Sequence, residues 1–158
     1  MIFVALGTQK FQFNRLLEEI DKLIENGKIK EEIFAQIGYS DYKPKNYDYK
    51  EFLDREEFSQ RMSKCDKVIT HGGTGSIINA IKNGKKVIAI PRLAKFREHV
   101  DDHQLQIVEE FQKMKFILTV TNMQELGIYI DELNNFESKE YMSNTKNIIE
   151  SIDLDISS

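Results

Sequence analysis

A glycine-rich segment in the middle of the chain contains the residues whose types and spacing best suit chemistry. It reads His71-Gly72-Gly73-Thr74-Gly75-Ser76. Glycine tolerates positive φ and leaves no side chain between the backbone and a ligand. A helix that starts here would present unpaired N–H groups and the positive end of its dipole, which together favour a phosphate. The hydroxyls of Thr74 and Ser76, and a ring N–H of His71, could add further donors.

The segment therefore predicts a binding site for a diphosphate. The alternative is a tight strand-to-helix turn in which glycine serves steric needs only. That alternative accounts less well for a histidine before the glycines and for hydroxyl side chains on both sides of Gly75.

Two better-known phosphate loops do not fit this segment. A dinucleotide fingerprint has three spaced glycines after the first strand and an acidic residue about twenty positions later. Here Ile78 follows Gly73 and Gly75 where the third glycine would stand, and the segment follows a middle strand. A P-loop has a first glycine five positions before its Gly-Lys pair. For Gly84-Lys85 that position is occupied by Asn79, so the P-loop pattern fails. The alternative of an NAD-type oxidoreductase or another Rossmann enzyme is therefore disfavoured.

Metal binding is a further alternative for the histidines. His99 and His103 are four residues apart, and with Asp102 they could hold a metal ion if they shared one helix face. Proline and charge upstream indicate that the helix begins near Asp101 or Asp102, which leaves His99 in a loop. The only Asp-x-Asp, at residues 153–155, falls in a tail that we expect to be solvated. We therefore expect no metal and no cofactor.

The elements that must position these residues follow from the hydrophobic pattern. Short apolar runs predict strands at residues 2–6, 32–37, 67–70, 87–90 and 116–120. Residues 49–53 could form a further short strand or an extended segment. Helical spacing of apolar residues predicts intervening helices, among them residues 76–83, 103–111, 123–133 and 141–152. Alternating strands and helices predict an α/β fold: a Rossmann-like, doubly wound, mostly parallel sheet with helices on both faces.

In such sheets ligands bind at the carboxyl ends of the strands. Both glycine turns, after Leu6 and after Thr70, fall at such ends. We expect one domain over residues 1–158, with its core at about 1–135 and a C-terminal helix at about 139–152.

Composition narrows the possible partners. The chain has 158 residues, 41% of them hydrophobic and 30% charged, as in ordinary globular domains. A net charge of -4 gives no reason to expect nucleic acid as a partner. Cys65 is the only cysteine, so no intramolecular disulfide can form, and we expect a buried thiol in a cytoplasmic protein. No stretch approaches the roughly 20 apolar residues of a membrane helix.

At this point the order of the motifs resembles a known family, the C-terminal domain of glycosyltransferase family 28. The resemblance rests on residues 68–77 (VITHGGTGSI), Gly84, Ile90-Pro91 and Asp101-Asp102-His103-Gln104. The opening, residues 3–8 with Phe13 and Arg15-Leu16, is similar to a narrower group of single-domain chains. These pair with a membrane-associated subunit in dolichol-linked N-acetylglucosamine assembly and in bacterial exopolysaccharide and capsule synthesis. Residues 98–104 look most like the bacterial polysaccharide branch.

The resemblance implies the C-terminal half of a type B glycosyltransferase fold, which binds a UDP-sugar. It assigns the donor diphosphate to residues 71–76, with Gly7 and Thr8 approaching the same cleft, and the ribose to Asn79, where relatives often carry a carboxylate. The donor sugar would contact Asp101 and Gln104, with Asp102 and His103 as further candidates. Gln9 stands where close relatives often show histidine, which weakens any acid–base role for that loop.

The implied activity is inverting transfer of a sugar from a UDP-sugar to a lipid-linked saccharide acceptor. The catalytic base is unknown: it is expected on a partner chain, with His71 and His103 as weaker candidates. The chain would then be cytoplasmic and recruited to the inner face of the membrane by an acceptor-binding subunit. Arg92, Lys95 and Arg97 predict a basic loop that could meet the acceptor, the partner or the membrane, or be merely solvated. The alternative function is a non-catalytic enhancer subunit that binds a nucleotide sugar.

Overall fold

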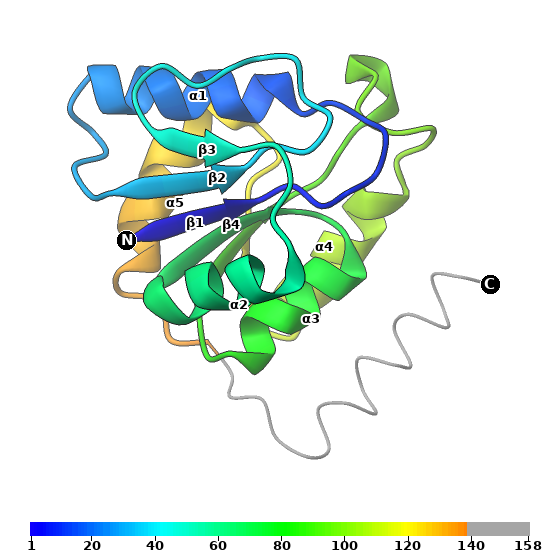
Figure 1. Cartoon of the computed structure of the whole chain (residues 1–158). Helices are drawn as coiled ribbons and strands as arrows, with labels where there is room; N and C mark the ends of the chain where they lie inside the picture. Colours follow the sequence, from blue (N-terminus) through cyan, green and yellow to red (C-terminus); the bar gives the residue numbers. More distant parts are fainter. Residues whose placement is uncertain (139–158) are drawn as a thin grey trace.

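The computed structural model describes residues 1–138 of the chain (Figure 1). The predicted helix at about 139–152 and the Asp-x-Asp at residues 153–155 lie outside the described residues. No helix in the described part is long and apolar enough to cross a membrane.

A six-stranded sheet forms the centre of the domain, and all its strands are parallel. The strand order is β3-β2-β1-β4-β5-β6, the doubly wound order of Rossmann-like domains, which confirms the predicted fold class. The strands are β1 (Ile2–Ala5), β2 (Ile33–Gln36), β3 (Asp48–Lys50), β4 (Lys67–His71), β5 (Lys86–Ile90) and β6 (Leu118–Thr119).

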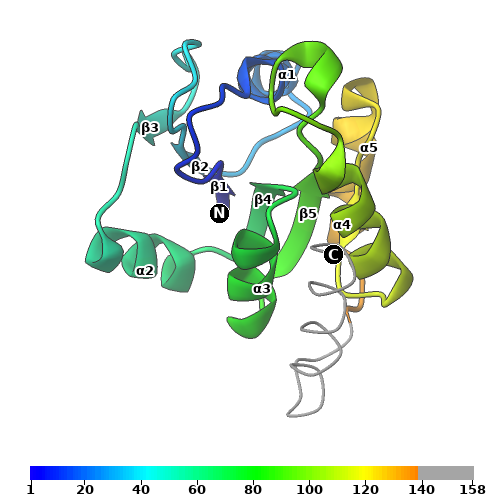
Figure 2. The ribbon, with the colours of Figure 1, turned by 90° about the vertical axis from the view of Figure 1, so that its right-hand side faces the viewer.

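Within residues 1–138, five helices cover the two faces of this sheet, as Figures 1 and 2 show from two sides. They are α1 (Asn14–Glu25), α2 (Arg55–Lys64), α3 (Thr74–Lys82), α4 (His103–Lys113) and α5 (Leu126–Leu133), with short 3-10 turns η1 (Ala94–Phe96) and η2 (Met123–Glu125). Helix α3 begins at Thr74 rather than at Ser76 as predicted, because Gly73 already provides the extended backbone of the N-cap. The predicted helix 123–133 starts as the 3-10 turn η2.

Alternating side chains of the strands build one core on each face of the sheet. Ile2, Val4 and Leu6 pack with α1 and α5, whereas Phe3 and Ala5 pack with α2, α3 and α4. β1 is buried along its whole length, which explains its unbroken apolar sequence.

The order of the strands reverses between β1 and β4, which are hydrogen-bonded neighbours. Ala5 lies opposite Thr70 in this pair, so both strands end at the same edge of the sheet. The loops after β1 and after β4 therefore flank the crevice where doubly wound proteins bind ligands. Figure 2 views the molecule from the side toward which the strands point.

Candidate functional site

The N-terminus of α3 lies directly after β4, and no side chain caps it. Its N-cap residue is Gly73, no side chain accepts from the first turn, and no acidic residue stands there. The backbone N–H groups of Thr74, Gly75 and Ser76 have no intrahelical acceptors, because they belong to the first turn. The positive end of the helix dipole is therefore left for an external anion.

Helix α2 provides a contrast within the same molecule. Its N-cap, Asp54, accepts a hydrogen bond from the Glu57 backbone N–H at 2.8 Å, and Glu56 and Glu57 stand in its first turn. The positive end of α2 is thus satisfied internally. Of the two helices, α3 is the one that can attract an anion.

A pocket of about 510 Å³ opens beside this helix end. It brings together four of the predicted site residues: Gly7 and Thr8 from the β1 loop, and Ser76 and Asn79 from α3. Ser76 and Asn79 are three residues apart and so share one helix face. The opposite wall consists of residues that sequence reasoning did not identify, namely Gln36, Leu53, Asp54, Arg55, Phe58 and Ser59. They are distant from the glycine segment in sequence, and only the packing of α2 beside β2 brings them here.

Most of the glycines near the site serve internal packing. A Cβ on Gly73 would lie 2.4 Å from His71 Cε1, and one on Gly7 would lie 2.7 Å from His71 Nε2. A Cβ on Gly72 would lie 2.9 Å from Gln104 Cβ. Gly75 differs, because a Cβ there meets nothing within 4 Å. The steric explanation therefore holds for Gly7, Gly72 and Gly73, and only Gly75 leaves open space in front of the helix.

His71 is buried, and both its ring nitrogens are hydrogen-bonded within the protein. Nδ1 lies 3.2 Å from Gln104 Nε2, and Nε2 lies 3.1 Å from Ser76 Oγ. Burial is the main cause that lowers the pKa of His71 to about 3, and the nearby charge of Arg92 adds to it. The ring is neutral at physiological pH and has no free nitrogen. Neither the predicted N–H donation to phosphate nor a role as base finds support in this geometry.

The predicted sugar-binding segment, residues 101–104, divides into two kinds of residue. Gln104 is buried, and its oxygen accepts from the backbone N–H groups of Gly72 and Arg92 at 3.0 Å each. Asp101 and Asp102 are exposed and accept from the backbone N–H groups of His103 and Ala94. His103, the first residue of α4, is partly exposed. None of the four lines the 510 Å³ pocket.

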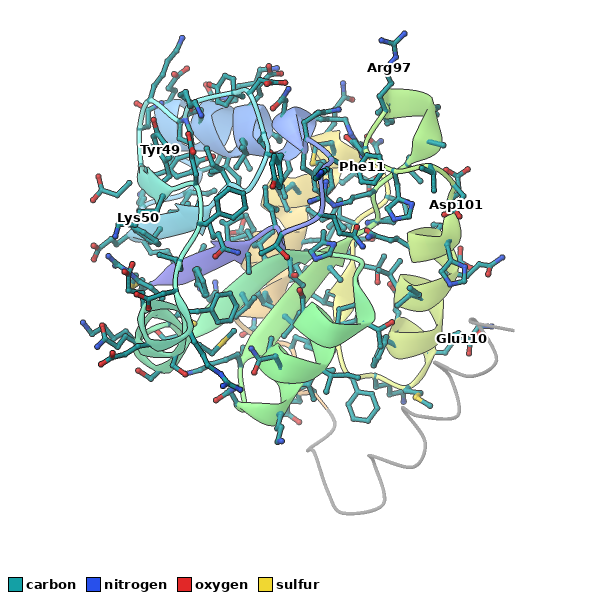
Figure 3. The ribbon with its side chains drawn as sticks, turned by 45° about the vertical axis from the view of Figure 1, so that its right-hand side comes forward. Phe11, Tyr49, Lys50, Arg97, Asp101 and Glu110 are labelled. Carbon is teal, nitrogen blue, oxygen red and sulfur yellow. The ribbon has the colours of Figure 1, made fainter. Side chains whose placement is uncertain are left out.

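Figure 3 shows Asp101 at the start of α4, beyond the loop that carries Arg97. The hydrogen bond from the His103 N–H lowers the pKa of the Asp101 carboxyl. Contact between this segment and a donor sugar stays a prediction.

The prediction of a basic surface loop is wrong for Arg92, which is 1% exposed. Its guanidinium donates to the carbonyl oxygens of Leu6, Phe11 and Gln12, which lie in and around the β1 loop. Lys95 and Arg97 are exposed, as expected of a basic surface. Arg92 thus joins the β1 loop to the β5 loop and cannot meet an acceptor or a membrane.

The metal alternative finds no support in the described part of the chain. Within residues 1–138 no three His, Cys, Asp or Glu side chains lie together in a way that could hold a metal ion. His99 Nδ1 instead lies 3.2 Å from Asp101 Oδ1. Cys65 is buried as predicted: its thiol donates to the Met62 carbonyl, and burial raises its pKa.

The sheet order and the site at its switch point define an α/β domain of the Rossmann-like class. Residues 1–157 match the glycosyltransferase family 28 C-terminal domain, and the chain belongs to this family.

The chain is also similar to individual proteins that carry a functional name. It is 34% identical over 87 residues to the UDP-N-acetylglucosamine transferase subunit ALG13 of Kluyveromyces lactis, a match over 51% of this chain and 42% of that protein. It is 26% identical over 98 residues to the protein of the same name from Candida albicans, covering 62% and 32% of the two chains. The matched region thus spans less than half of these relatives.

Solved structures show the same fold. A solution structure of ALG13 has a TM-score of 0.59 at 18% identity, with 96% of both chains covered. The crystal structure of Acinetobacter baumannii MurG also has a TM-score of 0.59, at 16% identity, and the match covers 95% of this chain and 49% of that one. SnogD from Streptomyces nogalater has a TM-score of 0.55 at 18% identity, over 99% and 39% of the two chains. The predicted likeness to one half of larger glycosyltransferases is confirmed for the fold.

Proposed function

We propose that this chain is the donor-binding subunit of an inverting glycosyltransferase, and that the N-terminus of α3 holds the diphosphate of a UDP-sugar. The observation that carries the proposal is the uncapped helix end beside a pocket at the switch point of the sheet. Unpaired N–H groups and a helix dipole together favour a diphosphate at that place.

The pocket has the size and composition that a nucleoside needs. Its volume of about 510 Å³ falls within the range of small-molecule sites. Leu53 and Phe58 offer apolar surface for a base, and the amide of Asn79 can hydrogen-bond ribose hydroxyls. In this proposal the nucleoside lies in the pocket and the diphosphate lies over Gly75.

The chemistry would be a direct displacement at the anomeric carbon. The acceptor hydroxyl oxygen forms the new glycosidic bond, the bond to the UDP oxygen breaks, and a base takes the hydroxyl proton. The N–H groups of Thr74, Gly75 and Ser76 would stabilise the negative charge that develops on the departing diphosphate. These residues support the reaction by electrostatics alone.

The base is missing from the described pocket. Asp54 is the only carboxylate among its lining residues, and it caps α2. We therefore propose that a membrane-associated partner supplies the base and the lipid-linked acceptor, and recruits the chain to the cytoplasmic face of the membrane. The names of the relatives make UDP-N-acetylglucosamine the first donor to test. The bacterial polysaccharide branch stays a prediction.

Calorimetric titration of the purified chain tests the binding class. We expect binding of UDP and no binding of NAD or ATP. Gly75→Val should reduce UDP affinity at least about tenfold, because its side chain occupies the space before the helix end and displaces hydrogen bonds to a charged group. Gly75→Ala is the graded control, with a smaller loss. Binding of NAD without UDP, or full UDP affinity in Gly75→Val, would contradict the proposal.

The missing base also favours a second candidate, a non-catalytic enhancer that binds a nucleotide sugar for its partner. A transfer assay with the chain, the partner and the reconstituted pair separates the two. A donor-binding subunit predicts transfer by the pair only, and loss of transfer with Gly75→Val. An enhancer predicts measurable transfer by the partner alone.

A further inference from the structure

The side chains of Gln104, His71 and Ser76 connect α4 to the N-terminus of α3. The orientation of the Gln104 amide is fixed by its hydrogen-bond partners. Gln104 faces the backbone N–H groups of Gly72 and Arg92, each 3.0 Å from its Oε1. Backbone N–H groups can only donate, so the amide atom between them must be the oxygen. The amide nitrogen of Gln104 is therefore the atom that faces His71.

This orientation determines which ring nitrogen of His71 carries the proton. Gln104 Nε2 lies 3.2 Å from His71 Nδ1, and an amide nitrogen can only donate, so Nδ1 accepts. The groups that face the ring are Gln104, Ser76, Arg92 and, further away, His99. Burial and the Arg92 charge lower the pKa of His71 to about 3, which keeps the ring neutral. Its single proton is therefore on Nε2.

The proton on Nε2 in turn orients the hydroxyl of Ser76. Nε2 lies 3.1 Å from Ser76 Oγ and donates to it. Ser76 Oγ is thus an acceptor toward the ring, and its own proton has no acceptor among residues 1–138. Ser76 lines the pocket in the first turn of α3. Its O–H is free to donate into the same space as the unpaired N–H groups.

We infer that Gln104 and His71 form a relay that fixes the direction of the Ser76 O–H, so that this hydroxyl donates to the anion held at the N-terminus of α3. The inference rests on the proposed function, which provides the anion as the diphosphate of UDP. Gln104 and His71 are positioning residues, since they act through Ser76. The predicted contact of Gln104 with the donor sugar stays a prediction beside this role.

The opposite ring tautomer would reverse the effect. With the proton on Nδ1, Nε2 would accept from Ser76, and the Ser76 oxygen would turn its lone pairs toward the anion. A donor to the diphosphate would become a repulsive neighbour. The direction of the relay therefore matters to binding even though neither Gln104 nor His71 contacts the ligand.

Gln104→Glu is the variant that reverses the relay with little change in shape. One carboxylate oxygen keeps the two hydrogen bonds from Gly72 and Arg92, and the other can only accept from His71. The neutral ring must then carry its proton on Nδ1. Gln106→Glu is the matched control, because it adds the same charge on the exposed side of α4.

Nitrogen NMR of the histidine ring in the free protein, at mildly alkaline pH, reads the tautomer directly. We expect the Nε2–H tautomer in the wild type and in Gln106→Glu, and the Nδ1–H tautomer in Gln104→Glu. Calorimetry with UDP then measures the consequence. Ser76→Ala and Gln104→Glu should each lose about tenfold in affinity, as expected for one hydrogen bond to a charged group. The double variant should lose no more than either single variant.

The two readouts separate failure of the relay from failure of the proposed function. A wild-type ring protonated on Nδ1, or losses from Gln104→Glu and Ser76→Ala that multiply, would overturn the relay even if UDP binds. Absence of UDP binding to a folded wild type would overturn the proposed function and the ligand role of Ser76, whatever the ring tautomer.

Discussion

At the scale of single residues, His71 is a buried titratable side chain whose pKa depends strongly on folding. The pKa of its ring falls from 6.5 to about 3 on folding, first because of burial and second because of Arg92. Between those two values the unfolded chain binds a proton that the folded chain does not bind. The folded state therefore loses stability as the pH falls from about 6.5 toward about 3, and regains it as the pH rises.

His71→Gln should reduce this acid sensitivity, because the glutamine side chain does not titrate. We expect the variant to be less stable than the wild type at neutral pH, since it loses part of a buried hydrogen-bond network. The difference between the two should shrink by the order of a few kcal/mol as the pH falls through the window above. Urea unfolding at a series of pH values measures it. Parallel stability curves would show that the ring does not titrate differently in the two states.

The sequence predicted the location of the site more accurately than the roles of its residues. Gly7, Thr8, Ser76 and Asn79 do meet at one pocket, because strand ends in a parallel sheet share an edge. The ligand contacts of Gly73 and Gln104 stay predictions, and the sequence showed no sign of the internal contacts that both residues make. A glycine that makes room for His71 and a glutamine that binds Gly72 have the same one-dimensional pattern as residues that contact a ligand.

At the scale of elements, two buried charged residues join the loop after β5 to the segment that follows β1. Arg92 donates to carbonyl oxygens of the β1 loop, and its guanidinium carbon lies 5.1 Å from the centre of the Phe13 ring. Glu98, fully buried, binds Arg15 through both oxygens at 3.0 Å and also accepts from the Leu93 N–H. In Figure 3, Phe11, which follows β1, lies on the side of the molecule where the loop with Arg97 is found. The β1 and β5 loops are therefore held as one unit.

Arg92→Lys should destabilise the fold by about 2–3 kcal/mol even though the charge is kept. A single ammonium group cannot replace a planar guanidinium that reaches several carbonyls, and buried carbonyls would lose their donors. The denaturation midpoint measures the loss. Arg97→Lys is the control, because Arg97 is exposed on the same loop and should stay within about 0.5 kcal/mol of the wild type. Equal midpoints for the two variants would contradict the structural role of Arg92.

Most of the strands were predictable because they lie in short apolar runs between turn residues. The exception is β3 (Asp48–Lys50), a polar strand at the edge of the sheet that only partly overlaps the predicted segment 49–53. The ends of the elements were less predictable. β6 has only two residues, although residues 116–120 are apolar enough for a longer strand, because its register with β5 covers only Ile88 and Ala89. The Arg92 and Glu98 contacts gave no sequence signal, since charged residues in a loop are usually solvated.

At the scale of the whole molecule, the proposed function makes this domain one side of an active site. The switch point between β1 and β4 gathers the two glycine turns, and the capped α2 and uncapped α3 flank one pocket. The solved neighbour MurG is about twice as long, with 49% of its chain covered. We expect the chain to bind a donor alone and to need a second protein for sugar transfer.

Titration of the isotope-labelled chain with UDP, followed by amide NMR, tests the diphosphate site at the N-terminus of α3 most directly. We expect the backbone N–H signals of Thr74, Gly75 and Ser76 to shift strongly as UDP binds, because these groups gain a charged acceptor. Gly75→Val should abolish the shifts in an otherwise unchanged spectrum. UDP binding that leaves these three signals unmoved would contradict a diphosphate site at the N-terminus of α3.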